Sequence, residues 1–285
     1  MNENNQTIPI RRSVVNVPDF VTKSQSDVSQ LKENKYSTQI IPLVTRGHFY
    51  PEGHPLSSGE IELIEMTAKH EDILANQDLI KKGKVLDKLI ESLVVDKSIR
   101  IDDILIPDKD AIFISIRRLA YGNEYPVSIT CPKCDVQNKV KINLAELSYK
   151  EFDFSNHPKG VNSFSYTLPQ SKVTVTYKLL NQLDESSIDA ELTQIRKISK
   201  ENTAELTTRM KYVITSIDGN PDRTGIRRFV EDKLSAMDSR DLRKHMKEYN
   251  PSVDMTFDFK CSECDLERRL NMPIGASFLW PDLDA

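Results

Sequence analysis

Two short motifs, Cys131-Pro132-Lys133-Cys134 and Cys261-Ser262-Glu263-Cys264, decide the fold of this chain and contain its only four cysteines. Short runs of alternating apolar residues flank both motifs, which is typical of β-strands. A strand, a tight Cys-x-x-Cys turn and a returning strand make a zinc knuckle, and two knuckles supply enough thiolates for a tetrahedral site. The sequence therefore predicts a zinc-ribbon-like site. Its predicted metal ligands are Cys131, Cys134, Cys261 and Cys264.

The motifs leave other interpretations open. The four thiols could be free, or they could have a redox role, although a thioredoxin-like Cys-x-x-Cys normally opens a helix rather than joining two strands. Disulfides are disfavoured because nothing marks the chain as secreted. Zinc is the favoured metal, and iron in the same four-sulfur geometry is the minor alternative. Nearby basic residues could offset the negative charge of a tetrathiolate site: Lys133, Lys139, Lys141, Lys260, Arg268 and Arg269.

Composition indicates a soluble globular protein of 285 residues, with 29% charged and 38% hydrophobic residues. The net charge of −4 gives no general attraction to nucleic acid or to an anionic membrane. We find no signal-peptide core at the N-terminus and no apolar run near the roughly 20 residues of a membrane helix. We therefore expect a reducing cytoplasm, where thiolates bind metal rather than each other.

The order of predicted elements indicates an α+β protein built from an internally duplicated α/β repeat. Residues 1–44 are a polar N-terminal arm, either a disordered tail or a segment that orders on a partner. Residues 45–148 form the first repeat, 149–163 a linker, and 164–285 the second repeat with a C-terminal tail. Strands are expected at 60–64 and 173–177. Helices are expected after Thr67, over Leu86–Val94, and from Pro107-Asp108, Asp184 and Asp238, with a further apolar stripe at Met210, Val213, Ile214 and Ile217.

One gapless shift of 130 residues, which carries Cys131 onto Cys261, is the basis for the duplication. It aligns all four cysteines, places Asp108 on Asp238, and matches the apolar positions of a helix and two strands. Further upstream, a shift of 124 places Leu86 on Met210 and Leu93 on Ile217. We therefore expect each repeat to contribute half of one metal site.

No motif indicates an enzyme. The chain lacks Gly-x-Gly-x-x-Gly, a Walker-type Gly-Lys-Ser/Thr and His-Glu-x-x-His. Four thiolate ligands leave no coordination position for an activated water. The five histidines, His48, His54, His70, His157 and His245, are scattered, and we expect each to be solvated or locally bonded. Arg223, Arg227 and Arg228 could contact phosphate, but such a helix face usually contacts water.

Three further features resemble the T4-type bacteriophage baseplate hub assembly protein family. They are the turn His54-Pro55-Leu56-Ser57-Ser58-Gly59, the Tyr121-Gly122 pair before the first cysteine motif, and the ending Pro273-Ile274-Gly275-Ala276-Ser277-Phe278-Leu279-Trp280-Pro281. The resemblance covers roughly residues 50–281, so it says nothing of the N-terminal arm. It implies a late, non-enzymatic structural protein that forms or nucleates the baseplate hub in the host cytoplasm, with retention in the virion left open. The implied partners are other hub and tail proteins.

The alternative is a zinc-ribbon module that binds nucleic acid or a transcription complex. The first knuckle is basic, as that reading requires, but the chain as a whole is acidic. Nucleic acid is therefore not an expected partner, and the oligomeric state stays open. The last apolar stretch, Phe278-Leu279-Trp280-Pro281, either folds back onto its own domain or anchors a neighbouring protein.

Overall fold

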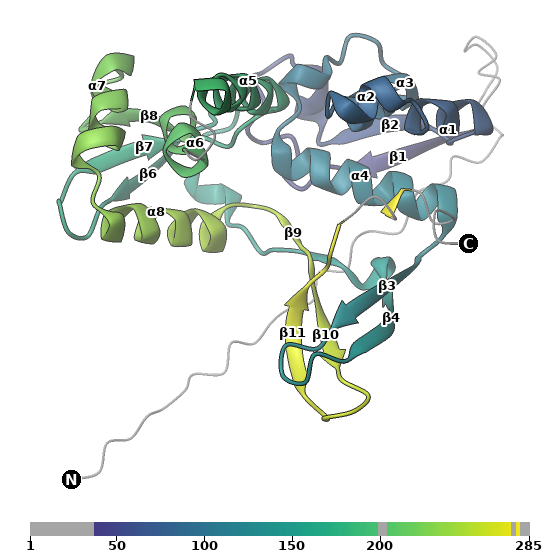
Figure 1. Ribbon diagram of the computed structural model, residues 1–285. Helices are drawn as coiled ribbons and strands as arrows, with labels where there is room; N and C mark the ends of the chain where they lie inside the picture. Colours follow the sequence, from purple (N-terminus) through teal and green to yellow (C-terminus); the bar gives the residue numbers. More distant parts are fainter. Residues whose placement is uncertain (1–36, 199–203, 275–277, 280–285) are drawn as a thin grey trace.

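The computed structural model describes residues 37–198, 204–274 and 278–279, which form two α/β lobes and a projecting ribbon (Figure 1). The first lobe contains β1 (Thr38–Pro42), β2 (Glu60–Ile64), α1 (Ala68–Leu74), α2 (Gln77–Lys81), α3 (Val85–Leu93) and α4 (Ile106–Tyr121). The second contains β6 (Phe164–Thr167), β7 (Thr174–Tyr177), α5 (Gln182–Ile198), α6 (Glu205–Val213), β8 (Ile214–Ile217), α7 (Arg223–Arg228) and α8 (Ala236–Tyr249). The ribbon contains β3 (Glu124–Thr130), β4 (Gln137–Asn143), β10 (Thr256–Lys260) and β11 (Glu267–Asn271).

The first lobe begins earlier than the sequence indicated. The sequence places residues 38–42 in the polar arm, but they form β1, which pairs antiparallel with β2. Ile41 and Leu43 are 0% and 1% exposed, so this stretch belongs to the core. The reason is that β1 is stabilised by pairing with β2. The mostly polar sequence around β1 does not reveal this partner. The rest of the arm, residues 1–36, lies outside the described residues.

The second lobe has a three-stranded antiparallel sheet in the order β6-β7-β8. The predicted strand at 173–177 is confirmed as β7, whereas the predicted apolar stripe is split between two elements. Met210 and Val213 belong to α6, which ends at Val213, and Ile214 and Ile217 belong to β8, which pairs with β7. The predicted shift of 124 residues is therefore wrong in detail, because it places the helical Leu93 on the strand residue Ile217.

The predicted starts of three helices are confirmed to within a turn, but the capping residues differ. Asn181 caps α5, and its side chain accepts the amide of Asp184 at 2.9 Å while Asp184 accepts the amide of Asn181 at 3.2 Å. Ser235 caps α8 by accepting the amide of Asp238 at 3.1 Å. Asp108 lies in the first turn of α4, which ends at Gly122 as predicted.

Asp108 and Asp238 instead attach each helix to the loop after the first strand of its lobe. Asp108 accepts the amide and hydroxyl of Thr45 at 2.9 and 2.7 Å and the hydroxyl of Tyr50 at 2.9 Å. Asp238 accepts the amides of Gln170 and Ser171 at 2.8 and 3.0 Å. Both aspartates are fully buried. The two lobes therefore hold their last helix in the same way.

A pH-dependent stability difference is expected from Asp108. Burial raises its pKa from 3.8 to about 6, in spite of the hydrogen bonds from Thr45 and Tyr50. A raised folded-state pKa means that the protonated carboxyl is favoured in the folded protein. Its stabilisation is therefore present below about pH 4 and lost as the pH rises through about 6.

Asp108→Asn should remove this dependence, because asparagine keeps an acceptor without the charge. Between pH 4 and pH 7, the wild type should lose roughly 3 kcal/mol of unfolding free energy relative to the variant. Urea denaturation of both proteins across this range measures the difference, and any pH dependence of the thiol site cancels in it. Parallel stability curves would contradict the expectation.

The predicted linker, 149–163, contacts both lobes. Tyr149 belongs to β5 (Ser148–Tyr149), which pairs with β9 (Val253–Asp254). The ring of Phe152 packs edge-on against Phe49 of the first lobe and Tyr249 of α8. The distances between the ring centroids are 5.7 and 5.6 Å. His157 shares this aromatic cluster, and its Nε2 lies 3.2 Å from the hydroxyl of Tyr249. The connection between the lobes thus packs half-buried aromatic side chains against the core.

The chain returns to the first lobe after the ribbon. Phe278 and Leu279 are 0% and 1% exposed. The ring of Phe278 stacks on Phe113 of α4 at 4.8 Å and meets Tyr125 edge-on at 4.9 Å. Trp280 lies outside the described residues. No helix within the described ranges is long and apolar enough to cross a bilayer.

Candidate metal centre

Two antiparallel hairpins, β3–β4 and β10–β11, carry the cysteine motifs at their turns, as predicted. The turns have the same backbone geometry. The amide of Cys131 donates to the carbonyl of Val136 at 2.9 Å, and that of Cys261 donates to Leu266 at 3.0 Å. Asp135 and Asp265, each directly after the second cysteine of its motif, have positive φ values of 57° and 50°. Aspartate tolerates this left-handed conformation better than most residues.

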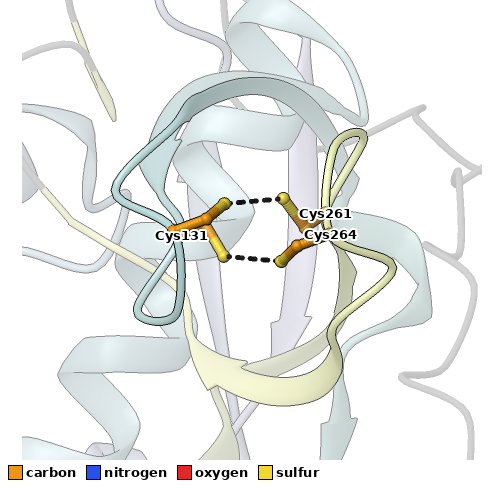
Figure 2. A group of neighbouring side chains, drawn as sticks. Cys131, Cys261 and Cys264 are labelled. Atoms are coloured by element: carbon orange, nitrogen blue, oxygen red, sulfur yellow. Dashed lines mark hydrogen bonds between the residues drawn. The ribbon is translucent and has the colours of Figure 1, made fainter.

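The hairpins bring all four predicted ligands together (Figure 2). The Sγ atoms lie within 4.8 Å of one another, and the pairs Cys131–Cys264 and Cys134–Cys261 are each 3.6 Å apart. These separations are too long for disulfides, in which the sulfurs are about 2.05 Å apart. They are close to the edge of about 3.8 Å in a sulfur tetrahedron with metal–sulfur bonds of about 2.3 Å. The donor set therefore fits a tetrahedral metal ion.

The thiols have unequal acidities. Backbone amides of Cys264 and Glu263 donate to Cys261 and lower its pKa to about 6. The amide of Val136 has the same effect on Cys134, but burial and the neighbouring thiols outweigh it and raise that pKa to about 12. The close packing of the thiols therefore opposes the ionisation of several of them together. A bound metal would supply the positive charge that this cluster requires.

Asn138 is a site residue that the sequence did not identify. It lies on β4, is 6% exposed, and its amide nitrogen lies 3.7 Å from the Sγ of Cys261. Its Oδ1 accepts the backbone amide of Ser262 at 2.8 Å. Asn138 thus bonds the first hairpin directly to the second knuckle. No local signal marks this role, because the contact joins positions far apart in the sequence.

The ribbon has only a small apolar core of its own. Phe259, Cys131 and Cys261 are its buried members, and partly buried residues such as Ile129 and Phe257 pack around them. Its buried members do not belong to the main core of the lobes, although Val140 and Phe257 pack against both clusters. Apolar burial alone therefore contributes little to holding the two hairpins together.

Three of the six nearby basic residues already have carboxylate partners on the ribbon or its approach. Lys141 pairs with Glu124 at 2.9 Å. Lys260 pairs with Glu267 at 2.9 Å, and Arg269 pairs with Asp254 at 3.1 Å. These pairs reduce the positive charge that the ribbon offers to a nucleic-acid backbone.

The fold and site define an α+β protein whose two hairpins converge on a four-cysteine cluster. The chain belongs to the family described as T4 bacteriophage base plate protein, whose model matches residues 52–280. Membership makes it a structural protein of the phage baseplate, with other phage tail proteins as its partners. No curated protein and no solved structure gives a significant match.

Proposed function

We propose that this protein is a non-enzymatic assembly factor of a contractile phage tail, which forms or nucleates the baseplate hub around a structural zinc ion. The convergence of the four thiols is the observation that carries the zinc assignment. A tetrathiolate ion has no open position for substrate, so its role would be to join the two hairpins. The hub role itself is supported by the family and by the sequence resemblance described above.

We also propose that the two lobes are repeats of one ancestral unit. In each lobe, the residue directly after a helix is extended and pairs with a strand of the sheet. Val94 follows α3 and bridges to Leu63 of β2, and Ile214 follows α6 and pairs with Tyr177 of β7. Matching Val94 with Ile214 implies that the two repeats are offset by 120 residues in the part before Asp108 and Asp238. Downstream, Asp108 and Asp238 keep the shift of 130 and make equivalent bonds to the loop after the first strand. The zinc ion would then join equivalent halves.

Freshly purified, reduced protein should contain one zinc ion per chain. Elemental analysis by mass spectrometry measures this directly, and thiol titration before and after chelation should show that four cysteines become reactive when the metal is removed. Iron at the same stoichiometry would support the site with the minor metal. Neither metal in reduced protein would contradict the assignment.

The assembly role is tested separately in infected cells. A tagged chain should co-purify from the host cytoplasm with baseplate intermediates, and analysis of mature particles would show whether it stays in the virion. A chain that retains zinc but never associates with tail proteins would contradict the hub proposal while leaving the metal site intact.

A further inference from the structure

Four cations lie along one exposed face of α8, opposite the face that packs into the second lobe. They are Arg240, Arg243, Lys244 and Lys247, here called the α8 stripe. At 3.6 residues per turn, they fall within roughly 100° of the helix circumference. Asp238, Ser239 and Leu242 occupy the buried side of the helix. In Figure 1 the helix runs along the outer border of its lobe, on the side from which the ribbon projects.

Within the described part of the chain, few carboxylates neutralise the positive charge of the α8 stripe. Arg240 is 74% exposed and lies 3.7 Å from Asp241, and Arg243 donates its Nε to the carbonyl of Ser239 at 3.2 Å. The amine of Lys150 donates to the carbonyl of Lys247 at 2.6 Å, which adds a fifth cation at the end of the helix. The helix dipole favours cations near Lys247 but not in the first turns, where Arg240 lies.

The corresponding helix of the first lobe, α4, does not carry the four positive charges of the α8 stripe. The residues 130 positions earlier, on α4, are Asp110, Phe113, Ile114 and Arg117. That face is covered in this structure: Phe278 of the C-terminal segment stacks on Phe113, and Arg117 is only 2% exposed. One lobe thus covers this helix face with the chain's own tail. The corresponding face of the other lobe is open and basic.

We propose that the α8 stripe binds an acidic segment of a partner protein. The stripe is a local concentration of positive charge on a chain whose net charge is −4, so it can attract the carboxylates of an acidic segment. Asp241 and Glu248 border the stripe on one side and disfavour a duplex laid across it. The identification of the partner as another tail protein rests on the proposed assembly role, but the binding itself does not.

The test compares two charge-matched variants of the full chain. Arg240→Glu, Lys244→Glu and Lys247→Glu together reverse three of the four charges of the α8 stripe and leave Arg243, which is bonded to the carbonyl of Ser239. The control combines Lys69→Glu, Lys81→Glu and Lys82→Glu, which are exposed on α1, α2 and the residue after α2. The probe is fluorescein-labelled poly-glutamate of about 20 residues, with a 20-base-pair DNA duplex as the competing class, both at low salt where surface charge acts most strongly.

The wild type should bind poly-glutamate, and the stripe variant should bind it at least about tenfold more weakly, whereas the control should change by less than about threefold. Unchanged zinc content and thermal midpoint would show that the fold and the metal site are intact. No binding by the wild type, or equal losses in both variants, would overturn the proposal. Tighter, stripe-dependent binding of the duplex would overturn it in favour of a nucleic-acid surface.

Discussion

Cys131→Ser or Cys261→Ser is expected to abolish metal binding and unfold the ribbon while leaving the two lobes folded. Both side chains are buried at the centre of the ribbon, where Phe259 is the only other buried residue of the apolar cluster. A structural zinc site contributes on the order of 10–16 kcal/mol of apparent binding energy in small peptides. Serine is not a thiolate, so most of this stabilisation would be lost, and the small apolar cluster cannot replace it.

Two measurements follow this change. Metal content should fall from one ion per chain to below about a tenth, since the loss of one thiolate weakens the site and opens a coordination position to water. Hydrogen exchange in β3, β4, β10 and β11 should accelerate at least about a hundredfold, while β7 and α4 keep their protection. Chelation of the wild type should reproduce the pattern, and added zinc should reverse it.

Ser128→Ala is the matched control, because Ser128 is exposed on β3 and lies outside the cysteine cluster. It should retain the metal and the exchange protection. A Cys261→Ser protein with full metal content and an ordered ribbon would refute the four-thiolate site. Global unfolding of both lobes would instead show that the ribbon is needed for the whole fold.

The four-cysteine cluster is predictable from the sequence because most of its determinants are local. Each Cys-x-x-Cys turn lies between two short runs that read as strands, and the hairpins form as those runs indicate. Only the contact between the two knuckles is long-range. It could still be inferred, because a tetrahedral site needs four thiolates and each knuckle supplies two. Asn138 was missed for the opposite reason, because its contact with Ser262 exists only once the hairpins face each other.

The errors in the element assignments have a common physical cause. Met210, Val213, Ile214 and Ile217 fit a helical period, yet the chain leaves the helix at Val213 because Ile214 pairs with Tyr177 of β7. Similarly, Ile41 is a strand residue because β2 lies beside it. Periodicity reports which residues are apolar, while tertiary pairing decides between helix and strand when the run is short.

The paired aspartates show what the sequence register could indicate and what it could not. Asp108 and Asp238 match under one shift, and the sequence predicts that a helix begins at each of them. Their burial and their bonds to Thr45 and Gln170 depend on loops more than 60 residues away, as the separations of 63 and 68 positions show. The sequence alignment of the two halves therefore indicates that the two aspartates correspond, but only the folded structure shows what they bond.

Phe278→Ala is expected to destabilise the protein by about 3–5 kcal/mol, because it removes a fully buried ring and leaves a cavity. The ring stacks on Phe113 and contacts Tyr125, so it connects the end of the chain to α4 and to the base of the ribbon. The midpoint of urea denaturation should fall accordingly. Ile274→Ala is the control, because Ile274 is 43% exposed and should change stability by well under 1 kcal/mol.

A double-mutant cycle with Phe113→Ala separates the stacking contact from general burial. If the two rings interact directly, the coupling free energy should be about 0.5–1.5 kcal/mol. Additive losses would mean that the tail is held by burial alone. If Phe278→Ala matches the small effect of Ile274→Ala, the segment does not stabilise the isolated protein. The apolar ending would then be explained as an anchor for a neighbouring tail protein, which loss of tail assembly in the Phe278→Ala phage would reveal.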